Sequence, residues 1–336
     1  MLPSVLQFLI SAAVIIAAGS VLTQFGDIIS HRTKLGGLLV GSILIAGATS
    51  LPELAVDVNA VRMGAPDLAV GDLMGSSLFN LLILAVLDLT RYSHGRMLSE
   101  TSARHALAAS VSIALTAVAA IFILLGPRLE SATFLRIGPG SVALVAAYVL
   151  GIRLIFCTRV EPEKTSRKSP PSWIPGVGKL KLKGAIVGYV IAAIIILAAA
   201  PVLAQAADEL AKSTGLGGTF FGSTFVALCT SLPEMVTTFT AVRMKAFDMA
   251  LGNVFGSNCF NMVLLVPLDF VDPGSLLSSV AQTHAYTALC AIVVTAVVIL
   301  GQLFRVERKK PFVEPDALLA IFLVLCSLVG LYLLKE

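Results

Sequence analysis

Charged residues are scarce in this 336-residue chain. Asp, Glu, Lys and Arg make up 13% of it, hydrophobic residues make up 57%, and the mean hydropathy is +0.93. A soluble domain carries roughly 25% charged residues, so the composition excludes an ordinary soluble protein. Apolar stretches of about 20 residues recur along the whole chain, which is typical of a polytopic helical membrane protein. The net charge of +4 gives no reason to invoke nucleic acid.

Motifs for several kinds of chemistry are also missing. The five cysteines lie in apolar stretches and form no Cys-x-x-Cys pair, so we expect them to be small core residues. No Gly-rich phosphate loop occurs, which argues against coupling to ATP, and we expect no cofactor and no enzymatic activity. The first 20 residues are apolar but lack a basic start, which favours a first membrane helix over a cleaved signal peptide.

The hydropathy pattern predicts an all-α polytopic membrane protein with ten transmembrane helices. The longest connection, 159–182, is rich in Pro, Ser and Lys and is expected to be a cytoplasmic linker. It separates a first five-helix half, 1–158, from a second, 183–336. The predicted spans are 3–24, 35–61, 66–89, 103–125, 137–158, 183–207, 216–242, 248–270, 280–303 and 313–333.

The distribution of Lys and Arg predicts the orientation. With the long linker in the cytoplasm, 19 of the 24 Lys and Arg residues fall on the cytoplasmic side and five on the other. Basic residues concentrate on the cytoplasmic side of membrane proteins. We therefore expect both termini to face outward (N-out/C-out), in the inner (plasma) membrane of a bacterium or archaeon.

The two halves repeat each other. Residues 35–88 align with 216–269 at a shift of 181, without a gap and with 26 of 54 positions identical. The motif TSLPE occurs at 49–53 and again at 230–234. Because each half has an odd number of predicted spans, the second copy enters the membrane upside down. This is the inverted-topology repeat of secondary transporters.

The TSLPE motif places a proline and a carboxylate inside apolar segments. Pro52 removes a backbone donor, which can free carbonyl groups near Ala46 to face a ligand. Thr49, Ser50 and Glu53 share one helical face. The second copy offers Ala227, Thr230, Ser231 and Glu234 in the same way. Such an all-oxygen set suits hard cations such as Ca²⁺ and Na⁺.

The next predicted helix of each half adds further polar groups. Ser76 and Asn80 are four residues apart, as are Ser257 and Asn261 in the second copy. Hydrogen bonding between helices is the ordinary role of such residues. A charge at the centre of a bilayer costs about 2.5–3.5 kcal/mol even on lenient scales, so two glutamates in register predict function.

These paired segments, which are GxTSLPE-like and GSxxFN, resemble the α-repeats of the sodium/calcium exchanger family, within the cation/Ca²⁺ antiporter superfamily. The resemblance places the α-repeats at 35–89 and 216–270 and covers nearly the whole chain. It implies alternating access, in which Ca²⁺ or several Na⁺ ions occupy the same mid-membrane oxygens. The outer surface of the protein is expected to contact membrane lipid. The implied ligands are four acidic or amide groups, Glu53, Asn80, Glu234 and Asn261, surrounded by Thr49, Ser50, Thr230, Ser231, Ser76, Ser257 and the carbonyls of Ala46 and Ala227.

The chain departs from the family pattern at several positions. Some relatives carry Asp where Asn261 stands. Asp57 and Asp72 have no acidic equivalents in the second copy, which offers Thr238 and Asn253 instead. Either aspartate could line a water-filled vestibule or reach the ion site. In the second case the coupling stoichiometry, or a coupling to protons, would change.

Three other polar residues have simpler expected roles. Asp67 is expected to cap a helix. Asp269 is expected either to reach the membrane interface or to make polar contacts between helices. His284 is expected to be an interfacial histidine, with a pH sensor as the sharper alternative.

The leading hypothesis is a secondary antiporter that exchanges Ca²⁺ for Na⁺. The alternative on the same fold is an exchanger of Ca²⁺ or another cation for H⁺, which the TSLPE sequence argues against. H⁺ and K⁺ remain further candidate ions. An intramembrane protease with Asp57 and Asp72 as a dyad is a weaker hypothesis, because a protease needs no duplicated site. A passive channel would require no counter-ion.

Overall fold

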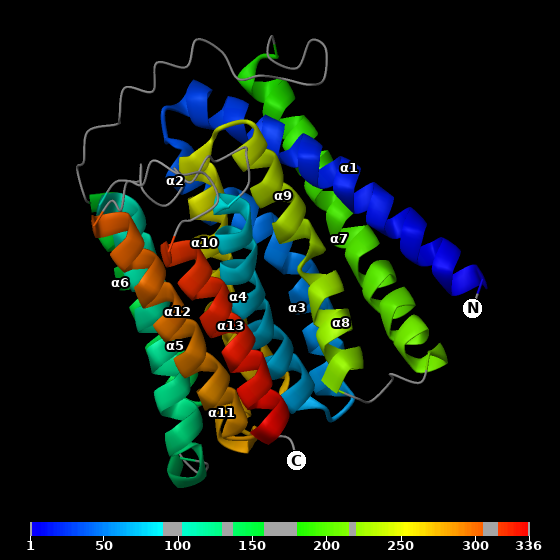
Figure 1. Cartoon of the computed structure of the whole chain (residues 1–336), viewed down its shortest axis with the longest axis vertical. Coiled ribbons are helices and arrows are strands. Elements are labelled where there is room, and N and C mark those ends of the chain that lie inside the picture. The colour runs from blue at the N-terminus through cyan, green and yellow to red at the C-terminus, as the bar shows by residue number, and fades with distance from the viewer. Residues whose placement is uncertain are drawn as a thin grey trace. The chain divides into compact units, whose positions relative to one another are not determined.

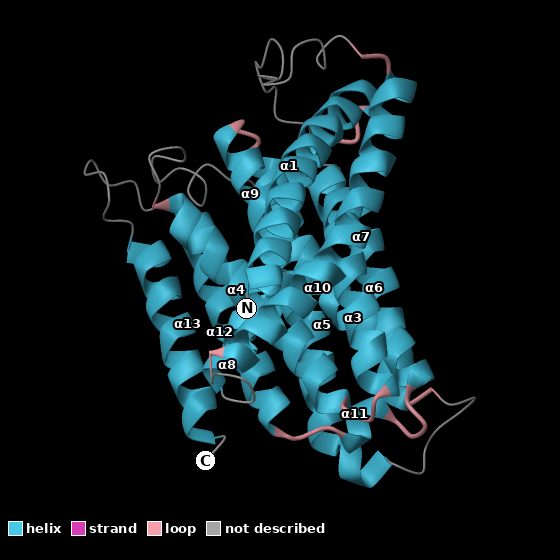
Figure 2. Cartoon of the chain, turned by 90° about the vertical axis from the view of Figure 1, so that its right-hand side faces the viewer, coloured by secondary structure: helices cyan, strands magenta, loops and turns pink. Residues whose placement is uncertain are grey.

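The computed structural model describes residues 2–89, 103–129, 137–157, 180–214, 220–304 and 315–334. Every regular element in these ranges is a helix, as Figure 2 shows, which agrees with the predicted all-α class. Apolar helices satisfy all their backbone hydrogen bonds internally, as a lipid environment requires. The elements are α1 (Leu2–Thr33), α2 (Gly37–Leu39), the π-helix η1 (Val40–Ile45), α3 (Ala46–Arg62), α4 (Pro66–Asp88), α5 (Ala103–Leu129), α6 (Pro139–Cys157), α7 (Leu182–Ser213), α8 (Phe220–Thr230), α9 (Leu232–Arg243), α10 (Phe247–Val271), α11 (Leu276–Ser279), α12 (Thr283–Phe304) and α13 (Pro315–Leu334).

Eight helical stretches in the described part of the chain are long and apolar enough to cross a membrane. Two of the ten predicted spans fall short of this standard. Helix α6 is shorter, and the predicted span 216–242 contains two helices, α8 and α9. The protein is therefore an integral membrane protein, whereas ten crossings and outward-facing termini stay predictions.

The chain forms two compact units that do not coincide with its two halves. Among the described residues, the first unit holds 2–52, 180–214 and 220–257, and the second holds 53–89, 103–129, 137–157, 258–304 and 315–334. The boundaries fall inside α3, after Pro52, and inside α10, after Ser257. Both halves of the sequence thus contribute to each unit. The five-helix division of the chain stays a prediction, and most of its linker lies outside the described residues.

In the first unit, α1 and α7 lie side by side and run in opposite directions (Figure 1). Opposite directions are what inverted copies would give their first helices. Ile15 of α1 is buried together with Leu203 of α7. Ile10 and Ile194 are more than half exposed on the outer surfaces. Such exposed apolar side chains are suited to contact with lipid.

In the second unit, α12 packs against α4, α5 and α13. Asp269 of α10 forms hydrogen bonds with residues at the start of α6 and of α11. Its carboxylate accepts hydrogen bonds from Gly138 N, Ser141 Oγ and Leu276 N, each at 2.7 Å. The side chain is fully buried, so the second expected role, polar contact between helices, is confirmed.

Candidate ion-binding site

The first TSLPE motif follows a π-helix. Element η1 ends directly before Ala46, and α3 then continues through Pro52 without a break. The irregular backbone expected around Pro52 therefore lies upstream of it. Thr49 Oγ1 donates to the carbonyls of Ile45 at 3.1 Å and Ala46 at 3.2 Å. A short π-helix is rare and frequently marks a functional site.

Three glycines explain why η1 lies so close to α10. A Cβ on Gly256 would sit 2.4 Å from Ser42 Cα, and one on Gly252 would sit 2.5 Å from the Leu38 carbonyl oxygen. A Cβ on Gly41 would likewise sit 2.4 Å from a backbone oxygen of α10. Backbone therefore packs directly on backbone, which only glycine allows here.

The second TSLPE motif has a different backbone. Helix α8 ends at Thr230 and α9 begins at Leu232, so the helix breaks at Ser231. Thr230 Oγ1 donates to the Ala227 carbonyl at 2.8 Å, and Ser231 N donates to the same carbonyl at 3.2 Å. Glu234 lies in the first turn of α9, where the helix dipole favours a carboxylate.

In the second unit, Glu53 joins α3 to α4. Its Oε1 accepts a hydrogen bond from Ser76 Oγ at 2.6 Å, and both side chains are buried. The structure therefore brings two of the predicted site residues into contact. A hydroxyl donor to a buried carboxylate also holds that carboxylate in one orientation.

Asparagine amides link α4 to α10 within the second unit. Asn80 Nδ2 donates to Asn258 Oδ1 at 3.0 Å, and Asn261 Nδ2 donates to Ser77 Oγ at 3.3 Å. Position 258 is the repeat equivalent of 77, and 261 that of 80. The same contact is thus made twice. Neither Ser77 nor Asn258 was among the predicted site residues.

The two predicted amide ligands keep an oxygen available. Their nitrogens take part in the helix contact, whereas Asn80 Oδ1 and Asn261 Oδ1 are buried and accept no hydrogen bond from the described residues. A buried acceptor without a donor is costly unless a cation or water meets it. The expected interhelical role and the expected ligand role are therefore compatible, because opposite ends of each amide serve them.

The remaining predicted ligands lie in the first unit. Ser50 Oγ and Ser257 Oγ are buried and have no hydrogen-bond partner among the described residues. Glu53, Ser76, Asn80 and Asn261 belong to the second unit. One site made of all twelve groups stays a prediction. The first unit holds Thr49, Ser50, Thr230, Ser231, Glu234, Ser257 and the carbonyls of Ala46 and Ala227.

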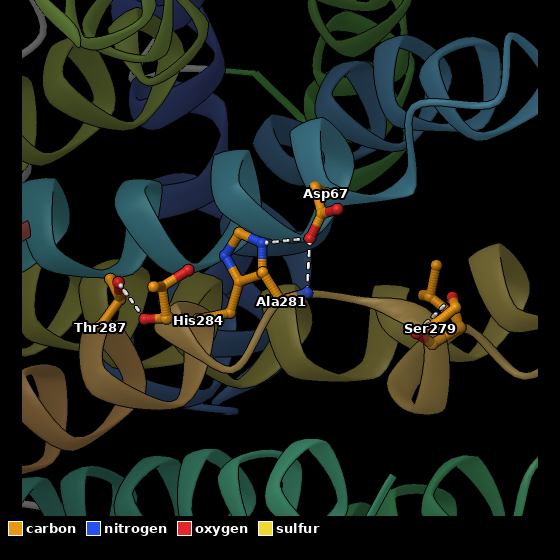
Figure 3. A network of polar contacts seen from close by, with 7 residues as sticks. Asp67, Ser279, Ala281, His284 and Thr287 are labelled. Carbon is orange, nitrogen blue, oxygen red and sulfur yellow. Dashed lines mark hydrogen bonds and ion pairs between the residues drawn. The ribbon is translucent and has the colours of Figure 1, made fainter. Parts of the chain in front are cut away.

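A separate polar network lies where α4 and α12 begin (Figure 3). Asp67 Oδ1 accepts hydrogen bonds from Ala281 N at 2.7 Å and interacts with His284 Nε2 at 3.0 Å. The prediction that Asp67 caps its own helix is wrong. Its carboxylate instead contacts Ala281 N and His284 Nε2, at the start of α12.

Comparisons with known proteins agree with this architecture. The chain is 24% identical over 287 residues to the putative antiporter CaxA of Alkalimonas amylolytica, covering 84% of this chain and 86% of that protein. It is 47% identical to the sodium/calcium exchanger MaX1 of Methanosarcina acetivorans over 58 residues, which is 17% of each chain.

Solved structures of the sodium-calcium exchanger NCX_Mj share the fold. One of them, soaked with Na⁺ and Sr²⁺, matches with a TM-score of 0.67 and 18% identity, over 98% of this chain and 99% of that one. The sequence model of the family described as sodium/calcium exchanger protein matches residues 3–157 and 184–333. The chain therefore belongs to the sodium/calcium exchanger family of membrane antiporters.

Proposed function

We propose that this antiporter exchanges Ca²⁺ for Na⁺ by alternating access, with the ions held by buried oxygens near the middle of the membrane. The observation that carries the proposal is the pair of amide oxygens on Asn80 and Asn261. Both are buried, and no donor from the described residues reaches them. They belong to the same unit as the Glu53 carboxylate.

The chemistry of the ligands favours Ca²⁺ and Na⁺. Ca²⁺ takes 6–8 oxygen ligands and tolerates mixed carboxylate, amide and carbonyl donors. Glu53 and Glu234 would supply two negative charges, which balance one Ca²⁺ or two Na⁺ ions. Hydroxyls and carbonyls of the TSLPE segments would complete the shell. The relative MaX1 is named a sodium/calcium exchanger, and the NCX_Mj crystals were soaked with Na⁺, Ca²⁺ or Sr²⁺.

Coupling to H⁺ is the second candidate on the same fold. The observation that favours it is the pair of aspartates, Asp57 and Asp72, in the first repeat alone. In either case we propose an inner (plasma) membrane location in a bacterium or archaeon, with both termini outward. The excess of basic residues on the linker side supports this orientation.

Transport into proteoliposomes tests the proposal. Purified protein is reconstituted, and radioactive Ca²⁺ uptake is measured with an outward Na⁺ gradient, an outward H⁺ gradient, or neither. We expect uptake driven by Na⁺ and lost in Glu53→Gln and in Glu234→Gln. The matched control is Glu209→Gln, which removes an exposed carboxylate of α7 and should transport normally.

The outcomes separate the hypotheses. Uptake driven only by H⁺ would show that H⁺, and not Na⁺, is the coupling ion, and would leave the fold assignment unchanged. Uptake that ignores every gradient would indicate a channel. Normal exchange in both glutamate variants would refute the proposed site.

A further inference from the structure

Two positions differ in charge between the repeats, and in the second copy, where both are buried, their side chains are in contact. Asn253 Nδ2 donates to Thr238 Oγ1 at 2.9 Å, and also to Thr237 Oγ1 at 2.9 Å. Asn253 and Thr238 are at most 1% exposed. At the shift of 181, their equivalents in the first copy are Asp72 and Asp57.

Helix register places the two aspartates in the same way. The bond from Ser76 to Glu53 aligns α3 with α4, and a short turn joins these two helices into an antiparallel hairpin. One turn forward along α3 from Glu53 leads to Asp57, and one turn back along α4 from Ser76 leads to Asp72.

The Asp57 carboxylate is buried, and one of its two oxygens lacks a hydrogen-bond donor. The residue is 1% exposed, and its Oδ2 accepts no hydrogen bond from the described residues. Asp72 is only partly buried. An ionised Asp57 beside an ionised Asp72 would still be poorly solvated and would be repelled by its neighbour. A single proton removes both costs, because a carboxylic acid can donate to the neighbouring carboxylate as Asn253 donates to Thr238.

From this arrangement we infer that Asp57 and Asp72 bind one proton between them, and that Ca²⁺ binding at Glu53 releases it. The second half of this inference rests on the proposed function, whereas the proton site itself does not. A metal ion is a poorer occupant. Ca²⁺ or Mg²⁺ needs six or more oxygens, and the residues one turn beyond the pair, Val61 on α3 and Leu68 on α4, are apolar.

The aspartate pair lies close enough to the proposed ion site for a bound cation to repel a proton on the pair. Glu53 lies one helical turn from Asp57, which is about 5.4 Å along the axis. A divalent cation bound by Glu53 repels the shared proton across that turn. Coupling is reciprocal, so the bound proton weakens Ca²⁺ binding by the same factor.

A histidine packs against the residue that precedes Asp72. A Cβ on Gly71, the residue before Asp72, would sit 3.3 Å from His284 Cε1. His284 Nε2 in turn contacts Asp67, whose side chain is 57% exposed (Figure 3). Besides the pair, the described acidic, basic and histidine side chains on the helices of the second unit are Glu53 and Arg62 on α3, Asp67 and Asp88 on α4, His105 and Arg128 on α5, Arg153 on α6, Asp269 on α10, His284 on α12 and Asp316 on α13.

The test counts protons released on Ca²⁺ binding. Purified protein in weakly buffered detergent solution is titrated with Ca²⁺, while an indicator dye reports pH and equilibrium dialysis reports bound Ca²⁺. The key variant is Asp57→Thr/Asp72→Asn, which installs the pair that the chain already uses at 238 and 253. Asp208→Asn, which removes a half-exposed carboxylate, is the matched control.

We expect wild type and Asp208→Asn to release about one proton more per Ca²⁺ than the double variant. We also expect the apparent Ca²⁺ Kd of wild type to change up to about tenfold per pH unit where the pair titrates, because one proton is displaced. Equal proton release in wild type and the double variant would overturn the inference. If the double variant does not fold, Asp57→Asn and Asp72→Asn, which keep the side-chain shape, replace it.

An infrared measurement in the absence of Ca²⁺ tests whether the aspartate pair binds a proton. The carbonyl stretch of a protonated carboxylic acid should appear in pH-difference spectra of wild type and be missing from the double variant. Its presence in both would refute the shared proton. If wild type bound no Ca²⁺, the proposed function would fail, and this spectrum alone would still decide whether the pair holds a proton.

Discussion

Gly256→Ala should destabilise the folded protein, whereas the same substitution at the equivalent Gly75 should not. A Cβ on Gly256 would lie 2.4 Å from Ser42 Cα and 2.5 Å from Ser42 O, whereas ordinary contacts begin at 3.4 Å. The backbones of η1 and α10 would have to separate by about 1 Å. No atom of the described residues lies within 4 Å of a Cβ on Gly75.

The magnitude follows from two opposing terms. Overpacking a core costs about 1–3 kcal/mol, and the upper end applies here because backbone atoms cannot turn aside. Replacing glycine by alanine inside a helix returns about 1 kcal/mol. Gly256→Ala should therefore lose about 2 kcal/mol of unfolding free energy, and Gly75→Ala should gain up to about 1 kcal/mol.

Thermal unfolding in detergent measures the difference. One kcal/mol corresponds to about 2–4 °C in a chain of this order of size, so the Tm of Gly256→Ala should fall by about 4–8 °C. The Tm of Gly75→Ala should stay level or rise. Equal Tm values for the two variants would show that the close contact between η1 and α10 is not a real constraint.

Three further substitutions probe contacts made by polar side chains. Asn258→Ser removes the acceptor that holds the Asn80 amide at 3.0 Å, and at about 1 kcal/mol per hydrogen bond the Ca²⁺ affinity measured by dialysis should fall about fivefold. Asp269→Asn turns an amide nitrogen toward at least one of three buried donors and should cost about 3 kcal/mol, read as a lower Tm. Asp67→Asn weakens a partly exposed contact with His284 and should cost less than about 1 kcal/mol by the same measurement.

The fold class could be predicted because its signals are compositional and periodic. Apolar stretches of span length and a shift that aligns 26 of 54 residues do not depend on tertiary contacts. The backbone of the two TSLPE motifs could not be predicted in the same way. The same TSLPE sequence lies in the continuous helix α3, after a π-helix, in the first copy, and spans a helix break at Ser231 in the second. What differs is the packing around them, which no local pattern contains.

The candidate ligands show the same limit at the level of single atoms. Asn80 and Asn261 were predicted as ligands, with hydrogen bonding between helices as the ordinary alternative. The sequence could not decide between these roles, because an amide has a donor end and an acceptor end. In the structure, Asn258 and Ser77 occupy the donor ends and leave the oxygens available.

The positions at which the repeats differ predict that pH acts differently on the two sides of the membrane. If the copies are inverted, as the alignment and the predicted odd number of spans in each half require, equivalent positions lie at opposite depths. An acidic pair at 57 and 72, matched by a neutral Thr238–Asn253 contact, then makes one half of the protein sensitive to protons and leaves the other insensitive. With both termini outward, the turn between α3 and α4 faces outside, and the acidic pair lies toward that side. External pH would then act on ion binding through this pair, while internal pH would have no equivalent carboxyl pair through which to act.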